Sequence, residues 1–280
     1  MNKLIMGLMC AGAACAASAE VCVKDGDTVA FMGDSITQLG NKPAGYVNLV
    51  MKGLEAVGVK DAKKLPAGIS GQRSTHMNAR LDKDVLVKRP QWMTFSCGVN
   101  DVWHGKGGVP LDQYKKLVAD IFDRCAASNV NVVVLTPTVI GEDLTNAENV
   151  KLAGYVAWLK EEAARRNLRI ADLNADFHAE LKRLRAAEPD RKGNLLTCDG
   201  VHMAFPGNCI MAWGVLRAMG VEPSQKDKVF AAFRQVSGAY SVSVSFTADE
   251  WADYQRRCKE AHRADYIYAR DLLIGPPKIK

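Results

Sequence analysis

The stretch VAFMGDSITQLG, residues 29–40, changes from an apolar run to Gly33-Asp34-Ser35 and then to a polar segment. A short, continuous apolar run is typical of a strand that is buried on both faces of a parallel sheet. The serine after it opens a helix-like stretch, and serine is also a preferred helix cap. Alone, the stretch indicates either a strand-to-helix turn chosen for its geometry or a nucleophile held at the carboxyl end of a sheet.

Strand-like and helix-like segments alternate along most of the chain. The strand-like runs cover residues 28–32, 92–97, 130–136 and 168–173, with a weaker one leading into Ala67-Gly68. The helix-like stretches cover residues 44–57, 74–88, 111–127, 146–166 and 206–219. This alternation predicts an α/β domain over residues 20–220, with a roughly five-stranded parallel sheet between two layers of helices. Such sheets place their sites at the carboxyl ends of the strands.

The first nineteen residues are predicted to be an export signal. Lys3 supplies the positive start, an apolar stretch follows, and Ala17-Ser18-Ala19 fits a cleavage site before Glu20. Cys10 and Cys15 lack the leucine three positions earlier that a lipid-anchoring signal would have, and no later stretch approaches a membrane span. We therefore expect a periplasmic or secreted protein that is not integral to a membrane, with a lipid anchor as the lesser alternative.

Residues 221–280 have a different pattern and are expected to form a C-terminal extension. The alternating segment YSVSVSF, residues 240–246, predicts a strand, and Thr247 followed by Glu250 has the spacing of a helix capping box. The extension is expected either to pack on the main domain or to pair with another copy of the chain. The second arrangement would make a homodimer through residues 221–280.

Charge and cysteine content exclude several classes of partner. The net charge of +6 is small and the basic residues are scattered among acids, so we expect no nucleic-acid binding. No C-x-x-C, H-E-x-x-H or phosphate-loop motif is present, so no metal or cofactor is expected. Six cysteines follow the export signal; Cys198 and Cys209 could form a disulfide or remain reduced, and Cys97 is expected to be a buried core thiol.

Three further segments place polar groups near predicted strand or loop ends. AGISGQRST, residues 67–75, contains Gly71, and SCGVNDVWHG, residues 96–105, contains Asn100; each would by itself be read as a turn. In TCDGVHMAFPGN, residues 197–208, Asp199 precedes His202 by three positions with Gly200 between them. A tight turn there would let the carboxylate reach the imidazole, fix its tautomer and stabilise its protonated form.

The four segments in this order resemble the blocks of the SGNH, or GDSL, hydrolase family over roughly residues 25–220. Ser35 in GDSIT, Gly71 in GISG, Asn100 in GVND and Asp199 with His202 in DGVH match those blocks. The resemblance implies a flavodoxin-like fold and a serine esterase without a cofactor. It also implies that Ser35 is the nucleophile, His202 its base and Asp199 the residue that orients His202. The oxyanion hole would be formed by the backbone N–H groups of Ser35 and Gly71 and the side chain of Asn100.

The resemblance and the polar segments beside the expected cleft favour short acetyl esters, particularly O-acetyl groups on carbohydrates. TQLGNKPAGY and VWHGKGGVP hold few of the aliphatic residues that an acyl-chain groove would need. Trp103 and His104 are possible substrate contacts, although a tryptophan here could instead be buried. Two alternatives stay open: a periplasmic lysophospholipase or thioesterase, and a carbohydrate-binding protein that kept the fold and lost turnover.

Overall fold

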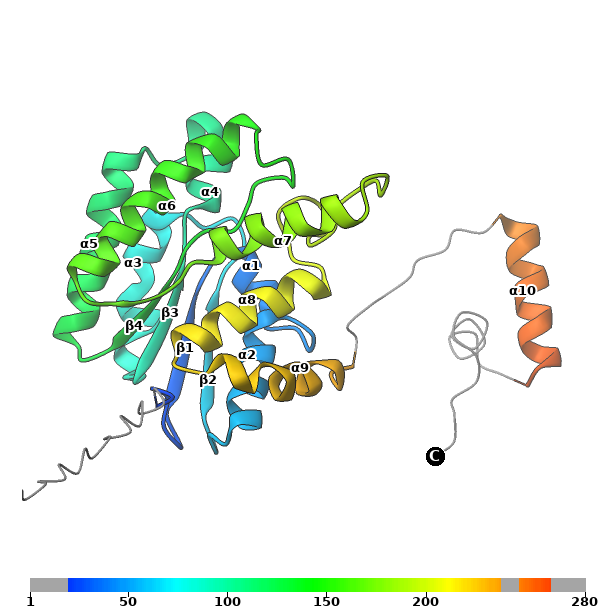
Figure 1. Ribbon diagram of the computed structural model, residues 1–280, viewed down its shortest axis with the longest axis horizontal. Coiled ribbons are helices and arrows are strands. Elements are labelled where there is room, and N and C mark those ends of the chain that lie inside the picture. The colour runs from blue at the N-terminus through cyan, green and yellow to red at the C-terminus, as the bar shows by residue number, and fades with distance from the viewer. Residues whose placement is uncertain (1–19, 238–246, 263–280) are drawn as a thin grey trace, which may run out of the picture. The chain divides into compact units, whose positions relative to one another are not determined.

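A parallel five-stranded sheet forms the centre of the computed structural model, which describes residues 20–237 and 247–262 (Figure 1). The strands lie in the order β2-β1-β3-β4-β5. Their bounds are β1 Thr28–Gly33, β2 Lys63–Gly68, β3 Trp92–Ser96, β4 Asn131–Leu135 and β5 Arg169–Ala171. All five strands of the predicted sheet are therefore confirmed, including the weak one that ends at Gly68.

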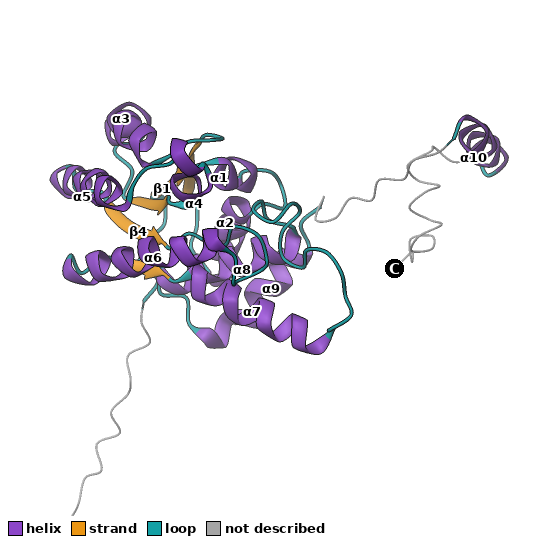
Figure 2. Cartoon of the chain, turned by 90° about the horizontal axis from the view of Figure 1, so that it is seen from above, coloured by secondary structure: helices purple, strands orange, loops and turns teal. Residues whose placement is uncertain are grey.

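The inner strand β1, which lies between β2 and β3, is buried because helices cover both faces of the sheet (Figure 2). Its residues Val29, Ala30, Phe31 and Met32 are fully enclosed, as expected for the strand of a doubly covered parallel sheet. From β1 the chain passes first to β2 on one side and then returns to β3 on the other. The gap between the carboxyl ends of β1 and β3 is the topological switch point, where sheets of this kind bind their ligands.

The helices cover both faces of the sheet, because each connection between two parallel strands crosses one face. On one side lie α3 Ser74–Asp84, α5 Leu111–Ala127 and α6 Ala147–Arg165, and on the other lie α2 Tyr46–Val57 and α8 Phe205–Ala218. Two short helices, α1 Ser35–Gly40 and α4 Val99–Trp103, begin directly after β1 and β3. The three-layer α/β/α architecture predicted from the sequence is confirmed.

Local capping explains where the structure departs from the expected bounds. The run at 168–173 was expected to be all strand, but α7 Leu173–Ala187 begins inside it because the Asp172 side chain accepts a hydrogen bond from the Ala175 N–H at 3.3 Å. The stretch at 74–88 divides into α3 and a short 3₁₀ turn at Leu86–Lys88. Further 3₁₀ turns lie at Gly105–Gly107 and Pro223–Gln225.

The compact unit that contains the sheet extends beyond the expected boundary at residue 220. Helix α9, Lys226–Arg234, packs on α2 and α8 through the buried side chains of Val229 and Phe233. The division between the two compact units of the chain falls after Ala239. Residues 221–237 therefore belong to the unit that contains the sheet rather than to a separate extension.

The second unit contains α10, Ala248–Glu260, whose capping box is as predicted. The Thr247 N–H and hydroxyl donate to Glu250 at 2.7 and 2.8 Å, and the Glu250 N–H donates to the Thr247 hydroxyl at 3.3 Å. The strand expected at 240–246 and the export signal at 1–19 lie outside the described residues. None of the helices in the described ranges is both long and apolar enough to cross a bilayer.

Candidate active site

Ser35 sits at a tight turn between β1 and α1, at the switch point of the sheet. Gly33 ends the strand, and a side chain there would clash with Thr37, whose Oγ1 would lie 2.1 Å from the added Cβ. Asp34 caps the helix, because its Oδ1 accepts a hydrogen bond from the Ile36 N–H at 2.9 Å. Ser35, at 8% exposure, is thereby held as the first residue of α1, with little freedom to move.

A chain of hydrogen bonds joins Ser35 to His202 and Asp199, although they are far apart in the sequence. Ser35 Oγ lies 2.8 Å from His202 Nε2, and His202 Nδ1 lies 2.6 Å from Asp199 Oδ2. A neutral imidazole meets both contacts when Nδ1–H donates to the carboxylate and Nε2 accepts from the serine hydroxyl. That tautomer leaves Nε2 ready to accept the serine proton.

Asp199 is held as a carboxylate at the base of this chain. Its partial burial would raise its pKa, but hydrogen bonds from the His202 ring and from the backbone N–H groups of His202 and Val201 outweigh burial and lower the pKa to about 2. Those two backbone groups donate to Oδ1 at 2.8 and 3.0 Å, and the histidine ring binds Oδ2. Asp199 therefore remains negative across the neutral pH range.

Glu142, which the sequence analysis missed, anchors the loop that leads to Asp199. Its side chain is 2% exposed. Its oxygens accept hydrogen bonds from the N–H groups of Leu195, Leu196 and Thr197 at 2.6, 2.8 and 2.8 Å, and from the Thr197 hydroxyl at 2.7 Å. Glu142 thus binds three consecutive backbone donors just before the Asp199–His202 turn.

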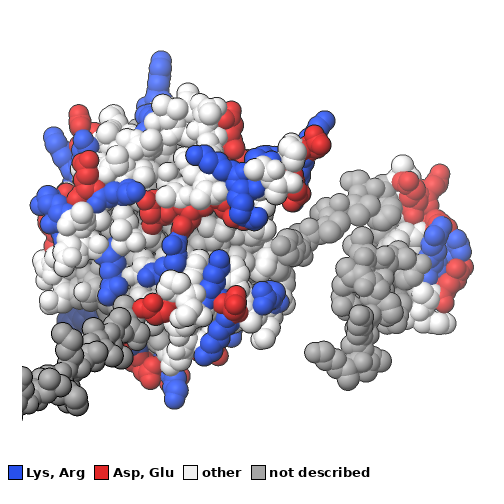
Figure 3. All heavy atoms as spheres, in the orientation of Figure 1, with Lys and Arg blue, Asp and Glu red and all other residues white. Residues whose placement is uncertain are grey.

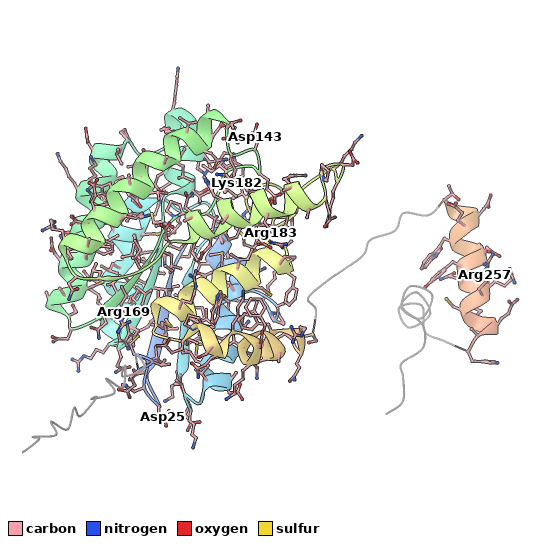
Figure 4. The ribbon with its side chains drawn as sticks, viewed as in Figure 1. Asp25, Asp143, Arg169, Lys182, Arg183 and Arg257 are labelled. Atoms are coloured by element: carbon pink, nitrogen blue, oxygen red, sulfur yellow. The ribbon has the colours of Figure 1, made fainter. Side chains whose placement is uncertain are left out.

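The same segment also holds the turn itself. The Gly141 N–H donates to the Gly200 carbonyl at 2.8 Å, and the Gly200 N–H donates to the Thr197 hydroxyl at 3.1 Å. Figure 4 shows the neighbouring Asp143 at the end of the sheet where α1 begins, opposite Asp25, which precedes β1. The loop after β4 therefore supports the histidine turn at the carboxyl edge of the sheet.

The three donors expected to form the oxyanion hole are the N–H groups of Ser35 and Gly71 and the side-chain amide of Asn100. The N–H groups of Ser35 and Gly71 make no hydrogen bond within the described part of the chain. Gly71 has a φ of +72°, a backbone conformation that glycine adopts without strain. The Asn100 Nδ2 donates to the Gln72 carbonyl at 3.0 Å and to Asp34 Oδ2 at the longer distance of 3.3 Å. Asn100 thus links the Gly71 loop to the Ser35 turn.

Two buried carboxylic acids lie behind these loops. Burial, with the nearby Asp101 as a smaller cause, raises the pKa of Asp34 to about 6. Asp101 is itself fully enclosed, and burial raises its pKa too. Its Oδ1 accepts hydrogen bonds from the Ser74 N–H at 3.0 Å and the Ser74 hydroxyl at 2.5 Å. Asp101, a second residue that sequence reasoning missed, therefore fixes the start of α3 against α4.

Trp103 and His104 lie at the end of α4, three and four residues beyond Asn100. Trp103 is 46% exposed, so the alternative of a buried tryptophan is wrong. His104 is also exposed, and its ring centroid lies 6.1 Å from the Trp103 ring. The two rings present an aromatic surface on the loop that follows Asn100.

The cysteines do not form the disulfide that was considered. Cys198 is an exposed free thiol on the loop, whereas Cys209 is a buried free thiol within α8. Cys97 is a buried thiol, as expected, and burial raises its pKa well above the usual value. The histidine turn therefore depends on hydrogen bonds, with Glu142 as the central acceptor.

Comparison with known proteins identifies the protein family. Residues 31–208 match the GDSL-like Lipase/Acylhydrolase family, and the chain belongs to this family. The protein is accordingly a carboxylic ester hydrolase with the SGNH fold.

Particular relatives narrow the comparison. The chain is 28% identical to an acetylxylan esterase of Geobacillus stearothermophilus over 222 residues, which cover 71% of this chain and 97% of that protein. The crystal structure of the acetyl xylan esterase AlAXEase is similar with a TM-score of 0.63 and 31% identity, covering 68% of this chain and 98% of that one. The crystal structure of Axe2, an acetylxylan esterase from G. stearothermophilus, is similar with a TM-score of 0.63 and 27% identity, covering 72% of this chain and 97% of that one. Structures of catalytic mutants of Axe2, with alanine in place of a serine, an aspartate or a histidine, are similar too.

Proposed function

We propose that the protein removes acetyl groups from carbohydrates with Ser35 as nucleophile, His202 as general base and acid, and Asp199 as the residue that orients His202. The observation that carries this proposal is the continuous chain from Ser35 Oγ through His202 to Asp199, with distances of 2.8 and 2.6 Å. Each of these groups has the partner that the chemistry requires.

Acylation begins when Ser35 Oγ attacks the carbonyl carbon of the ester and His202 Nε2 takes the serine proton. The imidazolium formed is stabilised by the Asp199 carboxylate, which stays ionised. His202 then gives its proton to the oxygen of the departing sugar hydroxyl as the ester C–O bond breaks. The products of this half-reaction are acetyl-Ser35 and the free alcohol.

Deacylation repeats the same steps with water. A water molecule attacks the acetyl carbon while His202 Nε2 takes its proton, and the proton then returns to Ser35 Oγ as acetate leaves. Because His202 accepts and donates one proton in each half-reaction, no cofactor is required for the proposed chemistry.

The oxyanion of each tetrahedral intermediate would be bound by the N–H groups of Ser35 and Gly71 and by Asn100. The two backbone N–H groups make no other hydrogen bond within the described residues. Asn100 Nδ2 donates to the Gln72 carbonyl at 3.0 Å and to Asp34 Oδ2 at 3.3 Å. The longer hydrogen bond, to Asp34, is the one that an oxyanion would replace. Several N–H donors directed at the oxyanion are typical of acyl-transfer sites.

An acetyl ester of a carbohydrate is the substrate class that the surroundings favour. The names of the related proteins, acetylxylan esterases, point the same way. The exposed rings of Trp103 and His104 offer a surface for a sugar rather than a channel for an acyl chain. Export by residues 1–19 remains a prediction, and it would place the enzyme where polymeric carbohydrates are found.

The proposal is tested by comparing hydrolysis of 4-nitrophenyl acetate, 4-nitrophenyl octanoate and acetylated xylo-oligosaccharides by the full chain. We expect turnover of the acetate ester and release of acetate from the oligosaccharides, with octanoate hydrolysed poorly. Fast octanoate hydrolysis with no acetate release from the oligosaccharides would assign the site to lipid or thioester substrates instead. Absence of turnover on any ester would favour a binding protein.

A further inference from the structure

Arg73 is the half-buried arginine whose guanidinium has no hydrogen-bond or ion-pair partner in the part of the chain that the structure describes. Within the described residues, the other half-buried guanidinium groups each donate to carboxylates or carbonyls; they belong to Arg80, Arg124, Arg166 and Arg185. Among residues 20–237 and 247–262, the Arg73 guanidinium has no hydrogen-bond acceptor, and its buried Nε is unpaired. A guanidinium is always charged and has five N–H donors, and such groups are normally hydrogen-bonded in proteins. An unpaired guanidinium beside the candidate active site therefore indicates that a ligand supplies the acceptor.

The backbone of Arg73 belongs to the loop that forms the candidate oxyanion hole. It lies two residues after Gly71 and directly after Gln72, whose carbonyl accepts the hydrogen bond from Asn100. Arg73 immediately precedes α3, and the next residue, Ser74, is fixed by Asp101. The guanidinium therefore extends from a backbone that is held firmly at the edge of the site.

The tip of the Arg73 side chain faces the loop that carries the exposed aromatic rings. A methyl group placed on Gly107 would lie 3.8 Å from Arg73 Nη1 and 3.9 Å from the Cβ of His104. The absence of a side chain at Gly107 leaves this corner open. Arg73 and His104 therefore border the same space, next to the Trp103 ring.

We propose that Arg73, Trp103 and His104 form a subsite for a carboxylate-bearing sugar, a uronic acid, that neighbours the acetylated residue of the substrate. The guanidinium would bind the carboxylate and the exposed rings would contact the sugar. Arginine suits this role because its planar array of N–H donors matches the two oxygens of a carboxylate. The inference rests on the proposed function and adds the class of glycan: acidic rather than neutral.

The test uses a matched pair of acetylated xylo-oligosaccharides, with and without a uronic acid branch, and 4-nitrophenyl acetate as a third substrate. The wild type is expected to have a kcat/KM about 10-fold to 100-fold higher on the acidic oligosaccharide, the size of effect of a charge-assisted hydrogen-bonded pair. Arg73→Gln should remove this preference, chiefly through KM. Arg73→Lys should restore only part of it, because an ammonium lacks the planar array of donors.

Arg234→Gln is the matched control, since Arg234 is an exposed arginine on α9 that belongs to neither the catalytic groups nor the subsite. It should leave the preference intact, and the Tm of every variant shows whether it has folded. Equal kcat/KM of the wild type on the two oligosaccharides would overturn the subsite and leave the proposed function standing. Equal losses on all three substrates in Arg73→Gln would also overturn it, because they would show that Arg73 only supports the Gly71 loop. If neither oligosaccharide releases acetate, the proposed function itself is overturned.

Discussion

The Ser35 turn and the His202 loop meet at one hydrogen bond but are held in different ways. The Ser35 turn lies between a strand and a helix, and its neighbours in sequence fix it: Asp34 caps α1 and Gly33 allows the close approach of Thr37. Between Leu195 and Ala204 the described structure contains no helix, and only an isolated bridge between Thr197 and Met203. The loop instead depends on Glu142, from a distant segment.

One half of the candidate site is therefore determined by neighbouring residues in the sequence, and the other half by a contact with a remote segment. Two regular elements leave few conformations to the short turn between them. An irregular loop satisfies its backbone donors only if another part of the chain supplies acceptors. Substitution of the residues that hold the two halves, Asp34 in the Ser35 turn and Glu142 beneath the His202 loop, should therefore have different effects on stability.

The largest expected effect follows from removing either end of that hydrogen bond. Ser35→Ala and His202→Ala should each lower kcat on 4-nitrophenyl acetate by about 10⁴-fold to 10⁶-fold, and the double variant should be little worse, since the residues act as a unit. Steady-state rates of all three purified proteins give the comparison. Losses that multiply in the double variant would mean that the two residues act independently.

The next effect should come from the side chain that links the Gly71 loop to the Ser35 turn. Asn100→Ala is expected to lower kcat by about 10²-fold to 10³-fold with little change in KM, because the lost donor acts mainly on the oxyanion of the transition state. Full kinetic curves on 4-nitrophenyl acetate separate the two constants. A rise in KM at constant kcat would instead place Asn100 in substrate binding.

Glu142→Gln tests the remote half of the comparison. One of the two carboxylate oxygens becomes a donor that faces backbone N–H groups, so at least one hydrogen bond is lost and unfolding should become easier by about 1–3 kcal/mol. Because the loop carries both Asp199 and His202, we also expect kcat to fall by about 10-fold, the cost of roughly 1.4 kcal/mol in the barrier.

Glu148→Gln, at an exposed position six residues further on, is the control and should change neither quantity. Urea unfolding and initial rates measure the two effects. Wild-type kcat in Glu142→Gln together with reduced stability would show that the loop keeps its geometry without the carboxylate, against the account of a remote anchor.

The last expected effect is a pH dependence of stability, and it belongs to the Ser35 turn, the half of the site that is held locally. The pKa of Asp34 is raised to about 6 in the folded protein, mainly by burial. A raised pKa means that the folded state holds the proton more tightly than the unfolded state. The contribution to stability is therefore complete below about pH 4 and is lost as the pH rises through about 6, amounting to roughly 2–3 kcal/mol.

Asp34→Asn removes this titration but keeps an oxygen to accept the hydrogen bond from Ile36. The stability of the wild type relative to the variant should therefore decline between pH 4 and 7. Urea unfolding of both proteins at pH 4, 5, 6 and 7 gives the difference curve. A flat curve would show that Asp34 titrates alike in the folded and unfolded states.

The parts of the candidate site that could be predicted from the sequence are those that follow strand ends. Ser35, Gly71 and Asn100 come shortly after β1, β2 and β3, and parallel strands bring their carboxyl ends to one edge. The Asp199–His202 contact was foreseen because it needs only a tight turn. For these residues, spacing along the chain already implies nearness in space.

The parts that could not be predicted depend on contacts across the chain. Glu142 lies 53 residues from Leu195, whose N–H it accepts, and no local pattern marks it. The Asp101–Ser74 contact joins two helix starts, and α9 extends the first unit past residue 220 by packing on α2. Acidic and basic side chains are also mixed over the visible face in Figure 3, so surface charge gives little indication of where the site lies.

Covalent labelling of the nucleophile shows whether His202 activates Ser35. The full chain would be treated with an excess of a phosphonate ester that reacts with activated serines, then weighed intact and mapped by peptide mass spectrometry. If His202 activates Ser35, we expect one adduct per chain on Ser35, no adduct in Ser35→Ala, and labelling slowed by at least 10³-fold in His202→Ala. Labelling of Ser35 at the same rate in His202→Ala, or an adduct on another residue only, would contradict it.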